Sequence, residues 1–424
     1  MNNWNSIDQQ HIWHPFTPLK GQQPIYVKKA KGAYLYSKDG RKILDLISSW
    51  WVTILGHSNK EIAKAIAKQA RKMEQVIFAG FTHKPALKLS ELLLSALPPD
   101  QSKLFFSDDG STSTEVAVKL ALQYWHNAGR PRKKVIALDG AYHGDTFGAM
   151  SVGGRSIFTE PFTNHLFDVE FLPFPEHDGE ATIQKMKSLA NEEVAAFIFE
   201  PLVQGAGGMR MYSPEILDQL INIARQHQII CIADEVMTGF GRTGKTFASD
   251  YLMEKPDIFC LSKGLTGGFL PMGITTVNTK VAEAFDNDVR EKTFFHGHSY
   301  TANPIACAAA CASFDILHQE SIQSAISELV ESHSQFQRKI MGHSMLDDLR
   351  QTGTILAMEL KTADRGYSAN IRETIYRHFL EKDMLMRPLG NVMYFLPPYI
   401  IKSKDMKRGY DEVASFLDLL EKTA

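Results

Sequence analysis

Between residues 103 and 261 the chain carries a series of short apolar segments that alternate with longer helical patterns. Their residues are apolar at successive positions rather than at every second one, which is typical of strands buried on both faces. Strands separated by helices predict an α/β fold built on a mostly parallel sheet. The segments are Leu104–Ser107, Val135–Leu138, Ala195–Phe199, Ile229–Ala233 and Ile258–Leu261.

The sequence on either side of this series has a different pattern. Near the N-terminus, the apolar segments 34–37 and 43–46 flank Asp39-Gly40, which predicts a hairpin with a tight primed turn. Helical spacing predicts two helices, one after Asn59 up to residue 73 and one over 87–97. Past residue 315, short strands and two amphipathic helices predict an α+β lobe. These strands are Ile355–Leu360, Met384–Arg387 and Met393–Leu396.

Composition and charge exclude several classes of protein. The content of 44% hydrophobic and 22% charged residues is typical of globular chains, and 46 basic against 48 acidic residues give a net charge of −2. Without a positive field, we expect no nucleic-acid partner. The four scattered cysteines form no zinc-type pair, so we expect buried thiols in a reducing compartment and no metal.

The sequence also argues against a membrane protein. The longest uncharged stretch, 293–314, contains His296, His298, Asn303 and Pro304, which a lipid-spanning helix rarely tolerates together. The first ten residues have no basic stretch followed by an apolar one, so we expect no secretory signal and a cytoplasmic location.

Three of the predicted strand ends carry residues with useful chemistry. The first is followed by Gly110 and Ser111, with a helix expected to open at Val116. Free amides and hydroxyls at a helix start suit a phosphate, although the same residues can simply cap the helix. Asp108 and Asp109 would repel a dianion, so they must point away from one if it binds here.

The other two strand ends carry a carboxylate and an amine. Asp234 ends one strand, where it could simply cap the next turn. Lys263 ends another; most lysines are solvated, but burial at a strand end leaves a free amine that can form a Schiff base. An amine, a carboxylate and a phosphate cradle together match the requirements of pyridoxal phosphate.

Four motifs then resemble, in order and spacing, the class III pyridoxal-phosphate aminotransferases, over nearly the whole chain. The resemblance implies a fold type I transferase. It would have a large domain with a mostly parallel central sheet (56–315) and a small α+β domain from both chain ends (1–55 and 316–424). The motifs are Ala141–Asp145, Glu200–Gly205, Asp234–Gly244 and Ser262–Gly264.

The same resemblance implies roles for individual residues. Lys263 would bind the cofactor covalently and shuttle a proton, Asp234 would pair with the ring nitrogen, and Gly110 and Ser111 would hold the phosphate. Tyr142 would stack on the ring and touch substrate; its alternative is ordinary core packing. The segment of Gly297, His298 and Ser299 would reach the site from a second subunit, with Gly297 near substrate. We therefore expect a homodimer with active sites at the interface.

Further segments are similar to one branch of that family, the diaminopelargonate aminotransferases, which convert 8-amino-7-oxononanoate to 7,8-diaminononanoate in biotin synthesis. Arg387 would bind the substrate carboxylate, unless it is a surface arginine, Trp50 would form an apolar wall, and Trp51 would pack in the core. The resemblance also places Phe16 in this substrate site. The segments are His11–Thr17, Ser48–Trp51, Gln123–Trp125, Gly205–Met211, Arg387–Gly390 and Leu396–Ile401.

Departures from the family pattern bear on the amino donor in a ping-pong reaction. Ala206 stands where many class III enzymes have a glutamate, which disfavours a glutamate donor. Phe16 replaces a tyrosine that is frequent in S-adenosylmethionine users, and His298-Ser299-Tyr300 replaces their Pro-Thr-Phe. We expect S-adenosylmethionine as donor, with lysine as the alternative. Two other hypotheses are a class III enzyme for ω-amino acids or diamines, and a catalytically silent binding protein.

Overall fold

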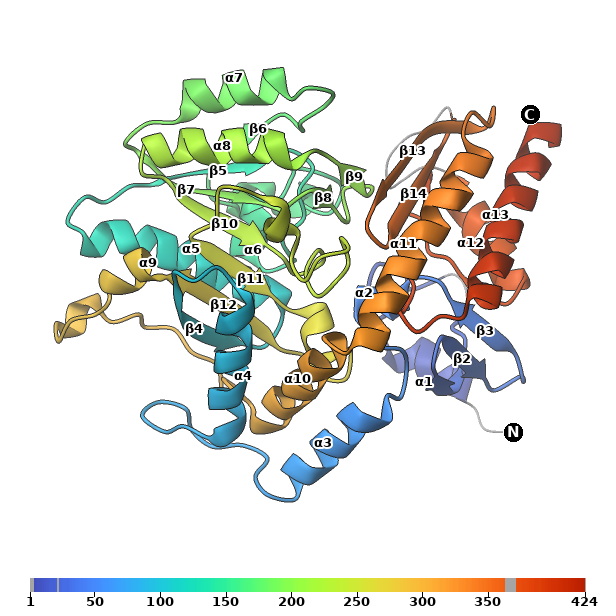
Figure 1. Ribbon diagram of the computed structural model, residues 1–424, viewed down its shortest axis with the longest axis horizontal. Coiled ribbons are helices and arrows are strands. Elements are labelled where there is room, and N and C mark those ends of the chain that lie inside the picture. The colour runs from blue at the N-terminus through green and yellow to red at the C-terminus, as the bar shows by residue number, and fades with distance from the viewer. Residues whose placement is uncertain (1–3, 21–22, 363–370, 424) are drawn as a thin grey trace.

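The computed structural model describes residues 4–20, 23–362 and 371–423, so the predicted domains 1–55 and 316–424 include some positions outside the described residues. A seven-stranded sheet forms the centre of the larger lobe (Figure 1), in the order β4-β12-β11-β10-β7-β5-β6. Its strands are β4 (Gln101–Ser107), β5 (Lys134–Leu138), β6 (Glu170–Leu172), β7 (Val194–Phe199), β10 (Ile230–Asp234), β11 (Ile258–Leu261) and β12 (Gly273–Asn278).

The sheet confirms the prediction of a mostly parallel arrangement. β11, β10, β7, β5 and β6 pair in parallel, and only β12 runs antiparallel to both of its neighbours, β11 and β4. All five predicted strands are present. β6 and β12 were not predicted: β6 has only three residues, and the threonines of β12 weaken its apolar pattern. The Thr275 hydroxyl donates to the Ser113 carbonyl, and the Thr276 hydroxyl donates to the Gln101 side chain.

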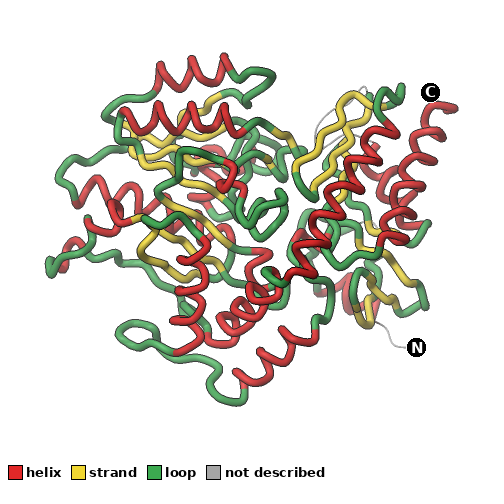
Figure 2. Tube along the Cα trace, viewed as in Figure 1, coloured by secondary structure: helices red, strands yellow, loops and turns green. Residues whose placement is uncertain are grey.

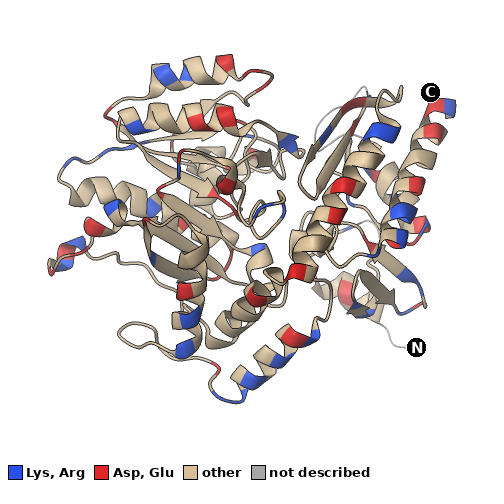
Figure 3. Cartoon of the chain, viewed as in Figure 1, with Lys and Arg blue, Asp and Glu red and all other residues tan. Residues whose placement is uncertain are grey.

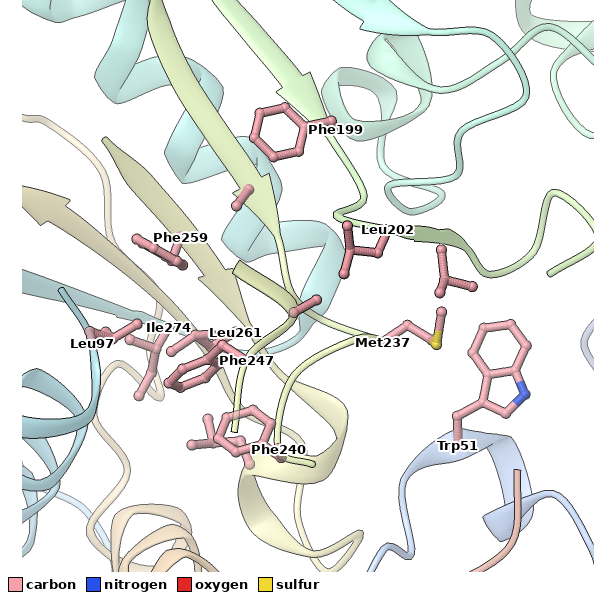
Figure 4. Close-up of a cluster of buried hydrophobic side chains, with 14 of the residues drawn as sticks. Trp51, Leu97, Phe199, Leu202, Met237, Phe240, Phe247, Phe259, Leu261 and Ile274 are labelled. Carbon is pink, nitrogen blue, oxygen red and sulfur yellow. The ribbon is translucent and has the colours of Figure 1, made fainter. Parts of the chain in front are cut away.

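Successive side chains of the central strands pack on opposite faces of the sheet, which explains their continuous apolar character. On β7, Phe197 and Phe199 join one buried cluster and Ile198 joins the other. Figure 4 shows Phe199, Phe259, Leu261 and Ile274 from neighbouring strands in the first of these clusters.

Helices cover both faces of this sheet (Figure 2). One face packs against α5 (Gly110–Asn127), whose Val116, Leu120 and Trp125 are buried there. The other face packs against α4, α7, α8 and α10, and α3 lies on α10. These helices are α3 (Lys60–Ala70), α4 (Lys84–Ala96), α7 (Glu180–Leu189), α8 (Pro214–Gln226) and α10 (Pro304–Leu317). Figure 3 shows acidic and basic residues interspersed along α3, α7 and α8, while the strands carry few.

A second lobe combines segments from both ends of the chain. Strand β15 (Met384–Leu385) pairs in parallel with β3 and so completes the sheet β1-β2-β3-β15. Leu44 and Leu46 from the N-terminal part share a buried cluster with Phe395 and Phe416 from the C-terminal part. The exact domain limits stay predictions. Its other elements are β1 (Val27–Lys31), β2 (Tyr34–Ser37), β3 (Lys42–Asp45), β13 (Leu346–Thr352), β14 (Ile355–Leu360), β16 (Val392–Phe395), α11 (Glu320–Ile340), α12 (Ile371–Glu381) and α13 (Ser403–Thr423).

Two local predictions need correction. The hairpin is present, but its turn is not the predicted primed type, since of Asp39 and Gly40 only the glycine has a positive φ, at 93°. Ser37 pairs with Arg41, which leaves a three-residue loop with glycine at the left-handed position. The first-motif helix begins at Gly110 rather than Val116, because the Asp109 side chain accepts from the Thr112 amide and caps it.

The remaining elements are short connections between these layers. They are α1 (Trp4–His11), α2 (Ser48–Trp51), α6 (Phe147–Val152), α9 (Thr279–Glu283), β8 (Val203–Gln204), β9 (Arg210–Met211), η1 (Glu160–His165), η2 (Ala248–Tyr251), η3 (Lys263–Thr266) and η4 (Arg290–Lys292). Within the described ranges, none of the helices combines the length and the apolar character needed to cross a bilayer.

The segment α2 is an irregular corner held by a buried carboxylate. Ser48, Ser49 and Trp51 have φ angles of 52°, 61° and 67°, which non-glycine residues adopt at a cost. The fully buried Asp45 accepts from the Ile47 amide at 3.1 Å and the Ser49 amide at 2.7 Å. It also lies 2.8 Å from His57 Nε2. Asp45 therefore satisfies the backbone that presents both tryptophans of this corner.

We predict that Asp45→Ala lowers the free energy of unfolding by about 2–4 kcal/mol, because two backbone donors and an imidazole lose their buried acceptor. Urea unfolding checks this. Asp411→Ala, which removes an exposed partner of Lys407, is the matched control and should cost less than about 1 kcal/mol. Equal losses in the two variants would contradict the assigned role of Asp45.

Candidate active site

The strand ends that carry the predicted residues meet at one edge of the large sheet, around a cavity of about 500 Å³. Parallel strands bring their carboxyl ends to the same edge, so residues far apart in sequence can converge there. We call this space the reaction cavity. The predicted residues that line it are Phe16, Trp50, Gly110, Ser111, Tyr142, Asp234, Lys263 and Arg387.

Lys263 presents an amine in a desolvated position. It is separated from the end of β11 by Ser262 alone, and its backbone has a φ of 42°, a left-handed conformation that turns the chain sharply after the strand. Burial lowers the pKa of its ammonium, although the nearby Asp234 and Glu200 carboxylates oppose the shift. Nζ lies 5.2 Å from the centre of the Trp51 ring. The amine therefore has the neutral, nucleophilic tendency that the prediction required.

Asp234 is only 4% exposed, and both of its oxygens have partners. Oδ1 accepts from the Val236 amide at 3.0 Å, so Asp234 does cap the turn after β10. Oδ2 lies 2.7 Å from His143 Nδ1. Asp234 therefore caps the turn and lines the reaction cavity at the same time. His143 is a site residue that the sequence analysis missed, although it stands next to Tyr142 in a motif already singled out.

Glu200 is a second residue that the sequence analysis did not assign. Its side chain is buried and bridges two walls of the reaction cavity, with Oε1 accepting from the Tyr142 amide at 2.9 Å and Oε2 from the Gly205 amide at 2.8 Å. Burial raises its pKa to about 7, partly offset by His143 and reinforced by Asp234. The sequence signal that could have identified Glu200 is its position directly after the fully apolar strand β7.

The first turn of α5 opens onto the cavity. Gly110 has no room for a side chain, since a Cβ would lie 2.7 Å from Val236 Cγ1. The prediction that both neighbouring acids point away from the cavity holds for Asp108, which lies 3.0 Å from His298 Nδ1 and does not line the cavity. Asp109 does line it, although its side chain accepts from the Thr112 amide and caps the helix. Within the described parts of the chain, no acceptor bonds the Gly110 and Ser111 amides, so this turn can bind an anion.

These features fit pyridoxal phosphate. The fit rests on a buried carboxylate that a histidine holds in place, a desolvated amine and a helix start too tight for a Cβ. Lys263 would hold the aldehyde carbon, Asp234 the ring nitrogen, and Gly110 and Ser111 the phosphate. Tyr142 lines the same cavity, and burial raises the pKa of its hydroxyl.

The opposite wall is aromatic and carries the predicted arginine. The Arg387 guanidinium lies 5.2 Å from the centre of the Trp50 ring. Phe16 contacts both Trp50 and Phe158, at 5.6 Å between ring centres in each case. Arg387 forms no ion pair with any described residue, so its donors can take a carboxylate. Phe158 was not predicted from sequence.

Trp51 has two roles in this wall. Its indole Nε1 donates to the Tyr394 hydroxyl at 3.0 Å, and its side chain is buried as predicted. Figure 4 shows its ring beside Met237. The same ring also lines the reaction cavity below Lys263, which the core prediction did not anticipate.

The segment with Gly297, His298 and Ser299 does not line the reaction cavity of its own chain. His298 pairs with Asp108, and the Ser299 carbonyl accepts from Gln75. The flanking Phe295 and Tyr300 are 68% and 64% exposed. The roles given to these three residues stay predictions.

Comparisons with known proteins agree with this geometry. A family model described as aminotransferase class-III matches residues 17–417. The adenosylmethionine-8-amino-7-oxononanoate aminotransferase of Synechococcus elongatus is 47% identical over 96% of this chain and 98% of that one. The protein of the same name from Helicobacter pylori is 36% identical over 99% of both chains.

Solved structures give the same result. The crystal structure of the Methanocaldococcus jannaschii adenosylmethionine-8-amino-7-oxononanoate aminotransferase superposes with a TM-score of 0.93 at 34% identity, covering 98% of this chain and 99% of that one. An omega transaminase from Pseudomonas jessenii, in complex with PMP, superposes with a TM-score of 0.91 at 26% identity, covering 98% and 97%.

The raised pKa of Glu200 predicts a pH dependence of stability. A carboxyl that titrates near 7 when folded and near 4.5 when unfolded binds its proton more tightly in the folded state. Its contribution therefore falls as pH rises from about 4.5 to about 7, by up to about 3 kcal/mol. We expect Glu200→Gln to flatten this part of the profile, measured by urea unfolding of the cofactor-free protein. Exposed Glu381→Gln is the control, and an unchanged Glu200→Gln profile would refute the assignment.

Proposed function

Because the chain belongs to the class III aminotransferase family, we propose that it converts 8-amino-7-oxononanoate to 7,8-diaminononanoate, with S-adenosylmethionine as the amino donor. One observation carries this proposal: a desolvated lysine and an arginine stacked on tryptophan line the same cavity. The lysine suits amino transfer, and the arginine–tryptophan pair suits a long apolar substrate that ends in a carboxylate. The names of the Synechococcus elongatus and Methanocaldococcus jannaschii proteins support the same substrate.

The cofactor of this family is pyridoxal phosphate, which supplies an aldehyde that condenses with amines and a ring that accepts the electrons of a broken Cα–H bond. Around it, the chain's own residues bind and orient. Asp234, fixed by His143, places a negative charge where the ring nitrogen would be held. Tyr142, fixed by Glu200, closes one side of the cavity.

Lys263 would act as the proton carrier. Because burial disfavours its charged form, its amine can accept the proton that the donor carbon loses, and in the reverse direction its ammonium can donate a proton to the carbon of the acceptor. The Trp51 ring lies 5.2 Å from Nζ, so this side of the amine faces an apolar surface. Donor and acceptor use the same lysine in succession, which corresponds to a ping-pong reaction.

On the substrate side, Arg387 would bind the carboxylate of the amino-oxo acid through paired hydrogen bonds. Trp50 and Phe16 would contact the aliphatic chain between the two polar ends. Ala206 lines the cavity with a methyl group where a carboxylate would be needed to switch the arginine between substrates. This supports a donor other than glutamate.

We extend the proposal to a homodimer in which the partner supplies Gly297, His298 and Ser299. The support is that these residues lie outside their own chain's reaction cavity, between the exposed Phe295 and Tyr300. A cytoplasmic setting is proposed as well, supported by four cysteines that are all unpaired and buried.

The proposed function predicts a specific pair of half-reactions. The purified holoenzyme is mixed separately with S-adenosylmethionine, lysine, alanine, glutamate and a diamine, and the visible band of the pyridoxal form is followed. We expect S-adenosylmethionine to remove the band and 8-amino-7-oxononanoate to restore it. A response to lysine alone would replace the donor. Failure of 8-amino-7-oxononanoate to restore the band, after a diamine has removed it, would refute the proposed acceptor.

We further predict that Lys263→Ala lowers turnover by a factor of roughly 10²–10⁴ or more, because both proton transfer and covalent attachment are lost. The variant should keep its melting temperature and still bind the cofactor. Borohydride reduction followed by mass spectrometry should fix the cofactor to residue 263 of the wild type and not to the variant. Exposed Lys404→Ala is the control. Near-normal turnover in Lys263→Ala would overturn the mechanism.

A further inference from the structure

A second cavity of about 310 Å³ adjoins the reaction cavity, and we call it the side cavity. The two spaces are separated only by residues that line both. Beyond that boundary, the side cavity extends between the glycine-rich segments 153–154 and 207–208 and the smaller lobe. The shared residues are Tyr142, His143, Gly144, Phe158, Ala206 and Leu389.

Two arginines in the wall of the side cavity have no acid partner. Arg210 donates to the Asp139 carbonyl at 2.9 Å and to the Gln204 side-chain oxygen at 2.5 Å. Its buried Nε has no partner within the described part of the chain. Arg155 donates only to backbone carbonyls at the end of α6, among them that of Ser151 at 2.9 Å. Among the residues described, no carboxylate oxygen lies within 4.0 Å of either guanidinium.

Both guanidinium groups are also partly desolvated, since burial lowers the pKa of Arg210 and of Arg155. A cation that has lost water and gained no counter-ion is stabilised when an anion binds beside it. The third arginine of the cavity, Arg350, differs in this respect, because it pairs with Glu359 at 2.8 Å and Asp348 at 2.5 Å.

The acids that line the side cavity do not neutralise this pair. Glu359 is engaged by Arg350, and Asp145 interacts with the Tyr142 hydroxyl. Asp139, Glu176 and Glu200 act on Arg210, and Asp168 acts on Arg155, only at longer range. The three arginines and two acids of the lining leave one net positive charge, next to the backbone of Gly207.

The proposed reaction needs such a group. In an α-amino acid donor the carboxylate is bonded directly to the carbon that loses its proton, whereas in 8-amino-7-oxononanoate it stands at the far end of an aliphatic chain. With its guanidinium 5.2 Å from the centre of the Trp50 ring, Arg387 lies where the far carboxylate of the amino-oxo acid would end, so a second cation is needed near the reacting carbon of the donor. At the boundary between the two cavities, Ala206 contributes only a methyl group.

We propose that the side cavity is the binding site for the α-carboxylate of the amino donor, held by Arg210 with Arg155. This inference rests on the proposed function, because it assumes an α-amino acid donor. It also gives a role to the segment Gly205–Met211, to which the proposed reaction had assigned none. Donor and acceptor carboxylates would then bind to different arginines in one active site.

The test uses the two half-reactions separately on the holoenzyme. Arg210→Met and Arg155→Gln should each raise the half-saturating concentration of S-adenosylmethionine by roughly 10- to 100-fold, the cost of a lost charged hydrogen bond. Neither should change the second half-reaction with 8-amino-7-oxononanoate. Arg387→Gln should do the reverse. Exposed Arg338→Gln, which loses only a surface partner, is the matched control for both.

A second readout separates recognition from a loss of structure. Decarboxylated S-adenosylmethionine lacks the group in question, so wild type should bind it more weakly than the parent donor, and Arg210→Met should bind the two equally. Binding is measured calorimetrically in a Lys263→Ala background, in which turnover is stalled. Unchanged donor affinity in both arginine variants, or equal losses for donor and acceptor, would overturn the inference. If the wild type itself reacts with no α-amino acid, the proposed function fails instead.

Discussion

The site depends on one electrostatic arrangement: the carboxylates of Asp234 and Glu200 and the amine of Lys263 are buried together. Burying a charge is costly unless a partner compensates for it. Asp234 is compensated by His143 and by the Val236 amide, and Glu200 by two backbone amides. Among the described residues Lys263 has no hydrogen-bond or ion-pair partner, and its burial lowers the pKa of the amine and so favours the reactive, neutral form. The uncompensated cost of burying a charge thus falls on Lys263, the group that must react.

The sheet explains how this arrangement is reached. β10 and β11 are adjacent and parallel, so Asp234 and the turn with Lys263 arise at neighbouring strand ends. The strands are buried on both faces, and their backbones are fixed by pairing before any side chain is positioned. Around this rigid edge, the smaller lobe supplies Trp50 and Arg387, which determine what can approach the lysine. Chemistry and specificity are therefore carried by different parts of the fold.

The separation has a consequence for a two-substrate enzyme. Lys263 and Asp234 must serve donor and acceptor alike, because the two substrates react at the same place in the site. The carboxylates of the substrates differ in position, so the walls must offer more than one cation. Arg387 faces the cavity from one side, and Arg210 lies behind Tyr142 and Ala206 on another. The absence of an acid at position 206 matters because a methyl group leaves that second direction open.

The sequence alone determined the α/β class and five of the seven strands of the large sheet. It also determined that Lys263, Asp234 and Gly110 stand at three strand ends. These features are local, since apolar periodicity and turn residues report burial within a short window. Contacts between distant segments could not be obtained that way. The tertiary structure decided that His143 and Glu200 orient Asp234 and Tyr142, and that the Arg387 guanidinium lies over the Trp50 ring. It also left Arg210 without a carboxylate partner among the described residues. It also moved the start of α5 to Gly110, because a capping side chain outweighs the weak helical propensity of glycine. One physical reason applies to all of these. The sequence pattern indicates whether a residue is buried, but only the packing of distant segments decides which group takes the place of water as its partner.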